Sequence, residues 1–214
     1  MSVVVRRASA VVIVLGALVL GIWAGYRYTA TDTVARPPTL QSGTALPQPR
    51  ALGPFSLADT AGGTFDTAAL QGRWTLLSFG YTSCPDVCPV VLGVLRDVQR
   101  RLDGRSPGVP LRVVFVSVDP ERAGLVHLKQ YVTYFDSRFV GATGSHAALQ
   151  ELTRLAGVLY QRAPGGDTSG YLVDHSATIL LTDPQGRLAA LFSPPHDAAA
   201  LANDVASLAG VAKP

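Results

Sequence analysis

The chain has 214 residues and carries 18 Lys and Arg against 15 Asp and Glu, a formal net charge of +3. This length suits one domain with attachments. The excess comes from Arg6, Arg7 and Arg27, since the remaining 15 basic residues (18 less these three) balance the 15 acidic ones. A balanced remainder gives no sign of a phosphate-binding face, which argues against nucleic acid as a partner.

The first 28 residues have the pattern of a membrane anchor. Residues 8–26 form a run of nineteen residues without a charge, nearly enough for a helix to cross a hydrocarbon core of about 30 Å. The run exceeds the apolar core of a cleavable signal peptide, about 7–15 residues, and it has no polar face as a soluble core helix would. We therefore expect an uncleaved, single-pass transmembrane helix at 1–28, with Arg6 and Arg7 keeping the N-terminus cytoplasmic.

A proline-rich stretch follows the anchor. Residues 35–54 contain five prolines and few apolar residues, which is typical of an extended tether. We assign residues 29–50 to this tether and residues 51–210 to one folded domain on the far side of the membrane.

Hydrophobic periodicity in the domain predicts alternating strands and helices. A short hairpin is expected around 59–63, buried strands at 74–81 and 111–118, and helices at 89–102, 125–135 and 146–156, the last with Ser145 as its N-cap. A short strand at 158–160, a Gly-rich loop, a hairpin of 171–181 with 187–192 and a helix capped by Asp197 complete the order. This is the order of a thioredoxin-like α/β fold, with a parallel centre and an antiparallel edge.

The densest chemical signal is FGYTSCPDVCP at residues 79–89, where a buried strand gives way to a helix. Cys84 and Cys88 are the only cysteines, and a disulfide closing so small a loop would add little stability. A helix N-terminus lowers a thiol pKa and favours thiolate, which attacks disulfides and binds metals. We prefer a helix capped by Cys88, because a cap at Cys84 would place Pro89 where it removes a helical hydrogen bond.

The spacing separates two kinds of chemistry. Thioredoxin-type oxidoreductases have two residues between their cysteines, whereas this chain has three, which permits a disulfide and also suits two thiolates around one ion. His175 precedes a predicted strand, at a turn expected to face the cysteine loop, and is the best-placed third ligand. Two Cys and one His suit copper. Zinc stays open, with Asp174, Asp86 or water as a fourth ligand.

The other polar residues carry weaker expectations. Asp86 and Asp174 are equally compatible with tuning the ligands and with capping turns. Asp119 is expected to fix the loop after its strand, without a chemical role. Three further histidines fall on predicted helix surfaces or in loops, where we expect solvated side chains: His127, His146 and His196.

Four stretches, at 79–92, 115–122, 139–144 and 171–188, resemble the Sco/SenC family of copper-binding proteins, which assist assembly of the copper centre in cytochrome c oxidase. The resemblance implies a thioredoxin-like fold, an N-terminal anchor and copper ligation by Cys84, Cys88 and His175. One departure concerns residues 123–125, Ala-Gly-Leu, where the family usually has Asp-Thr-Pro. This departure questions partner contacts at that segment rather than copper binding.

The expected function is that of a copper metallochaperone. Cys84, Cys88 and His175 would bind Cu(I), with Cu(II) as a second candidate state, and pass it to the copper-accepting subunit of cytochrome c oxidase. Other periplasmic copper or thiol-redox proteins are further expected partners, and the expected location is a bacterial inner membrane, with the C-terminal domain facing the periplasm or cell exterior.

Two other functions compete with this one. A thiol–disulfide oxidoreductase that keeps the target's cysteines reduced would need Cys84 and Cys88 but not His175. A peroxidase would use one cysteine to attack peroxide and the other to resolve the sulfenic acid.

Overall fold

The computed structural model describes residue 13 and residues 15–25, 38–105, 109–122, 124–162, 173–175 and 177–211, without the side chains of 162 and 173–175. The chain divides into two units, residues 1–36 and 37–214. In the first unit, residue 13 and residues 15–25 are helical and exposed. The rest of the predicted anchor lies outside the described residues, and no helix within them is both long and apolar enough to cross a membrane.

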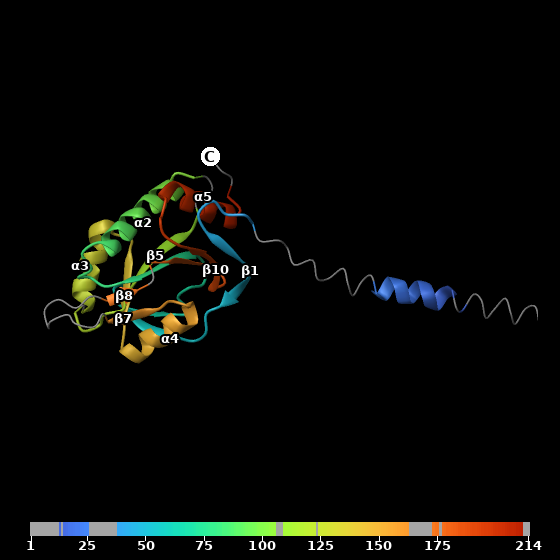
Figure 1. Cartoon of the computed structure of the whole chain (residues 1–214), viewed down its shortest axis with the longest axis horizontal. Coiled ribbons are helices and arrows are strands. Elements are labelled where there is room, and N and C mark those ends of the chain that lie inside the picture. The colour runs from blue at the N-terminus through green and yellow to red at the C-terminus, as the bar shows by residue number, and fades with distance from the viewer. Residues whose placement is uncertain are drawn as a thin grey trace, which may run out of the picture. The chain divides into compact units, whose positions relative to one another are not determined.

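The second unit is built on an eight-stranded sheet (Figure 1). Its order is β1-β10-β9-β4-β5-β6-β2-β3, in which β4, β5 and β6 are parallel and the outer strands pair antiparallel. The strands are β1 (Thr44–Ala51), β2 (Ser56–Asp59), β3 (Thr64–Asp66), β4 (Trp74–Gly80), β5 (Leu111–Ser117), β6 (Val140–Thr143), β9 (Ile179–Thr182) and β10 (Arg187–Phe192). The predicted parallel centre and antiparallel edge are confirmed. A separate pair joins β7 (Tyr160–Arg162) to β8 (Val173–His175).

Helices cover both faces of the sheet (Figure 1). Apolar residues of α2 (Val87–Asp103), α3 (Leu125–Phe135) and α5 (Ala198–Leu208) pack on one face, and those of α4 (His146–Ala156) on the other. Ser145 accepts a hydrogen bond from the backbone N–H of Ala148, and Asp197 accepts one from Ala200, so both predicted N-caps are confirmed.

The central strands bring two loops to one edge of the sheet. Every residue of β4 is buried, and the strand pairs with β5 in register from Trp74↔Leu111 to Gly80↔Ser117. Because the two strands are parallel and end together, the segments that follow them meet at their carboxyl ends. The N–H of Val118 accordingly donates to the carbonyl of Gly80 over 2.8 Å.

Two segments differ from the prediction. Residues 44–51, assigned mostly to the tether, form β1, which is an edge strand and therefore tolerates Pro47 and Pro49. The predicted hairpin with residues 187–192 is confirmed by β9 and β10, but its first arm, predicted at 171–181, is too long, since the described residues there form two strands. β8 pairs with β7, whereas β9 pairs with β10 and β4, so the two strands belong to different sheets.

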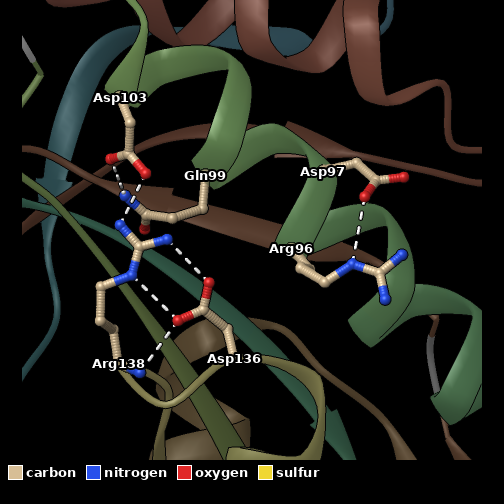
Figure 2. Close-up of polar contacts among 6 residues, drawn as sticks. All are labelled: Arg96, Asp97, Gln99, Asp103, Asp136 and Arg138. Atoms are coloured by element: carbon tan, nitrogen blue, oxygen red, sulfur yellow. Dashed lines mark hydrogen bonds and ion pairs between the residues drawn. The ribbon is translucent and has the colours of Figure 1, made fainter.

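A polar network fixes the C-terminal end of α2 (Figure 2). Arg138 donates to Asp103 over 2.6 Å and to Asp136 over 2.7 Å, and Gln99 donates to Asp103 over 3.1 Å. The hydrogen bonds from Arg138 hold the pKa of Asp136 below its usual value. The network joins α2 to the loop before β6, at the end of the helix opposite the cysteines.

Candidate metal centre

The end of β4 determines how closely the Cys88 sulfur can approach the sheet. A Cβ added to Gly80 would lie 2.5 Å from the Sγ of Cys88 and 2.9 Å from the ring of Phe115. Only glycine leaves room for the sulfur to approach the strand this closely. Gly80, the last residue of β4, therefore helps to position the Cys88 sulfur.

The helix begins one residue before Cys88, so the prediction that Cys88 caps it is wrong. Asp86 occupies the N-cap position and Pro89 is the third helical residue. The first N–H groups of a helix have no partner within it, so Pro89 costs no hydrogen bond there. The N–H of Cys88 is one of these groups, and it donates to the Sγ of Cys84 over 3.4 Å.

The two thiols differ in burial and in acidity. Burial alone would raise the pKa of Cys84, but hydrogen bonds from the N–H groups of Cys88, Asp86 and Val87 and from the Cys88 thiol outweigh it and lower that pKa. Burial raises the pKa of Cys88 far above its usual value, and its bond to Cys84 and the charge of Cys84 raise it further. Cys84 is half-buried, whereas Cys88 is only 2% exposed. Cys84 is thus the thiol suited to form a thiolate that meets solvent.

The segment after His175 lies against the cysteine helix. A small recess is lined by Val87 and Cys88 from α2 and by Ala177 and Thr178, the second and third residues after His175. β8, which ends at His175, also lies beside β4, with Cα atoms of the two strands within 8 Å. The backbone shortly after His175 therefore lies beside the cysteine helix.

The ring of His175 lies outside the described part of the structure, as does the side chain of Asp174. Among the side chains that are described, no group of three or more His, Cys, Asp or Glu could hold a metal ion. Ligation by His175, and the role of Asp174, accordingly stay predictions.

The remaining predicted residues have mixed outcomes. Asp86 is exposed and makes no side-chain capping bond. His127 is exposed, and the ring of exposed His146 lies 3.4 Å from the carboxylate of Glu121. His196 differs from the expectation of a solvated ring, because it is half-buried and its Nε2 lies 2.8 Å from the carbonyl oxygen of Ala177. It anchors the segment that lines the recess.

Tyr131 is a residue near the cysteines that the sequence analysis did not single out. Its ring packs 5.6 Å from that of Phe115, and its hydroxyl has no hydrogen-bond partner among the described residues. Burial raises the pKa of Tyr131, and the charges of Cys88 and Cys84 raise it further. Its place on α3, within an ordinary amphipathic pattern, gave no sequence signal of this proximity.

Comparison with known proteins decides the family. The family model described as SCO1/SenC matches residues 43–210. The chain belongs to the SCO1/SenC family. It is 36% identical over 153 residues to Protein SCO2 homolog, mitochondrial, of Bos taurus, a match that covers 72% of this chain but 58% of the bovine protein. SCO2-like protein RC0895 of Rickettsia conorii is 30% identical, over 82% of this chain and 85% of that protein.

Solved structures of the family have the same fold. The crystal structure of Arabidopsis thaliana ScoI with copper bound is similar with a TM-score of 0.68 and 35% identity, over 72% of this chain and 95% of that one. The thioredoxin-like α/β fold of this SCO1/SenC chain is thereby confirmed.

Proposed function

We propose that this protein is a copper metallochaperone, which holds copper as cargo with Cys84, Cys88 and His175 and delivers it to the copper centre of cytochrome c oxidase. The observation that carries the proposal is the pair of cysteines, in which the backbone N–H of Cys88 donates to the sulfur of Cys84, beside a recess bordered by the segment after His175. The copper-bound ScoI structure of Arabidopsis thaliana supports the choice of metal.

The donor set fits copper. Thiolate sulfur is a soft ligand that favours Cu(I), and imidazole suits copper as well. Cys84 is partly exposed to solvent and can begin ligand exchange with a copper donor or acceptor. Cys88 is buried and would keep its bond to the copper during this exchange. Because both thiols must lose their protons, binding releases protons and strengthens as the pH rises. Oxidation to a disulfide removes the thiolates and so abolishes binding.

The proposal includes a location. The charge pattern of residues 1–28 supports a single-pass anchor in a bacterial inner membrane, with the domain facing the periplasm or cell exterior. The expected acceptor is the copper-accepting subunit of the oxidase. Other periplasmic copper or thiol-redox proteins are the expected donors and reductants.

Competitive titration of the reduced protein with Cu(I) against a chromophoric chelator tests the ligand set. Structural zinc sites have a binding free energy of about 10–16 kcal/mol, which four ligands share at about 2.5–4 kcal/mol each. By analogy, removal of one copper ligand should lower the affinity by roughly 70- to 900-fold. We expect losses of this size for Cys84→Ala, Cys88→Ala and His175→Ala. His146→Ala, which removes an exposed ring, is the matched control. Unchanged affinity of His175→Ala would remove this residue from the site.

The asymmetry of the two thiols favours a second candidate function, that of a thiol–disulfide oxidoreductase. The Cys84 thiolate would attack a target disulfide and release one target thiolate. Cys88 would then attack the Cys84 sulfur, which releases the reduced target and leaves a Cys84–Cys88 disulfide. This reaction needs both cysteines but not His175. If His175→Ala loses copper yet supports oxidase assembly at the wild-type level, reduction rather than copper delivery is the function.

A further inference from the structure

The loop after β5 contacts the segment between β4 and α2, which carries Cys84. Asp119 is only 2% exposed, and its carboxylate pairs with the Nε of Arg122. The guanidinium carbon of Arg122 lies 5.1 Å from the centre of the Tyr81 ring, a cation–π distance. Tyr81 follows β4 directly and is itself buried, with 3% of its surface exposed.

Tyr81 in turn contacts both cysteines through its backbone. Its carbonyl accepts the N–H of Cys84 over 3.2 Å, and its backbone also hydrogen-bonds the Cys88 thiol. One residue therefore links the two sulfur-bearing positions at the start of α2. A displacement of Tyr81 would therefore act on both sulfur-bearing positions.

We propose that Asp119 and Arg122 are positioning residues for the thiol pair, acting through Tyr81. The buried carboxylate fixes the guanidinium, the guanidinium fixes the ring, and the Tyr81 backbone then holds Cys84 and Cys88 at chelating separation. For its copper readout the inference rests on the proposed function. The positioning itself is a property of the dithiol and is measurable without metal.

The expected effect follows from effective concentration. Chelation of one ion and closure of a disulfide both need one sulfur held close to the other, so both equilibria weaken when the loop loosens. Loss of a cation–π contact at a partly desolvated site corresponds to about a two- to thirtyfold change in such an equilibrium. If the Arg122 contact had only a structural role, its loss would lower the thermal stability and leave both equilibria unchanged.

The experiment uses two variants of Arg122 and a matched arginine. Arg122→Ala removes the contact, and Arg122→Lys keeps a cation that can pair with Asp119 and lie over the ring. Arg138→Ala is the control, because it also removes an ion-paired arginine but at the C-terminal end of α2 (Figure 2). Asp103, the partner of Arg138 on α2, lies fifteen positions after Cys88, or about 22 Å along the helix.

Two equilibria are measured for each full-length variant. The first is Cu(I) affinity. The second is exchange with glutathione disulfide, in which two electrons pass from the protein dithiol to give the protein disulfide and two molecules of glutathione. We expect Arg122→Ala to lower both constants by about two- to thirtyfold, Arg122→Lys to restore most of the loss, and Arg138→Ala to change neither.

A double-mutant cycle tests the route through the ring. If Arg122 acts through Tyr81, the effect of Arg122→Ala disappears in a Tyr81→Leu background. If Tyr81→Leu does not fold, the comparison of Arg122→Ala with Arg122→Lys still tests whether the contact controls the two equilibria. A lower melting temperature of Arg122→Ala with both constants at the wild-type value overturns the inference. Failure of the wild type to bind copper refutes the proposed function instead, and the glutathione equilibrium then tests the positioning alone.

Discussion

Gly80→Ala is the most direct perturbation of the site that the structure offers. The new Cβ would lie 2.5 Å from the Sγ of Cys88 and 2.9 Å from the ring of Phe115. Since optimal carbon contacts are about 3.5–4.0 Å, the sulfur or the strand must move by about 1 Å. Overpacking of this kind costs about 1–3 kcal/mol. For a domain of this size that cost lowers the melting temperature by roughly 2–12 °C.

The same displacement weakens metal binding. Because the sulfur of Cys88 is pushed away from the strand, we expect Cu(I) affinity to fall by about 10- to 100-fold, the range seen when groups that orient ligands are changed. Calorimetry and the chelator titration measure the two effects on one preparation of Gly80→Ala.

Gly93→Ala is the matched control. Gly93 lies in α2, and a Cβ there meets no atom within 4 Å. Alanine is the better helix former by about 0.5–1 kcal/mol, so this variant should melt slightly higher and bind copper as the wild type does. If Gly80→Ala melts within about 1 °C of the wild type and keeps its copper affinity, the close approach of the sulfur to β4 is not a constraint.

Three further predictions concern other parts of the domain. Arg138 holds the pKa of Asp136 below its usual value. The stability that Asp136 contributes is therefore present above its unfolded pKa of about 3.9 and is lost as the pH falls through the lower folded pKa. Urea unfolding at about pH 5 and pH 2 should show a smaller acid-induced loss of stability for Asp136→Asn than for the wild type. Asp204 is 2% exposed and accepts two N–H groups and a hydroxyl from the residues before β1. Its replacement by Ala should cost about 2–4 kcal/mol, or roughly 4–16 °C of melting temperature by calorimetry, whereas an effect below about 0.5 kcal/mol would contradict this anchoring. Because His196 holds a backbone carbonyl of the recess, His196→Ala should weaken copper binding by about tenfold while His146→Ala does not, and equal affinities of the two variants would show that this bond is irrelevant to the metal.

The sequence predicted the regular core well because its signals are local. The uncharged run of β4, the helical periodicity of α2 and the caps at Ser145 and Asp197 each depend on neighbouring residues alone. The prediction failed where a distant partner decides. The prolines of residues 44–51 argued against a strand there, yet β1 forms because β10 pairs with it. The sequence analysis also joined β8 and β9 into one arm of a hairpin, although they pair with different strands.

For the candidate site, the sequence by itself predicted the candidate donor atoms: two thiols four positions apart and a histidine ahead of a later strand. Only the tertiary structure decided which thiol has the lowered pKa and the greater exposure, that Gly80 must lack a side chain, and that Arg122, paired with Asp119, reaches Tyr81. The reason is physical. Ligand type is a property of single residues, whereas burial, hydrogen bonding to a sulfur and the approach of one loop to another exist only after strands distant in sequence have paired.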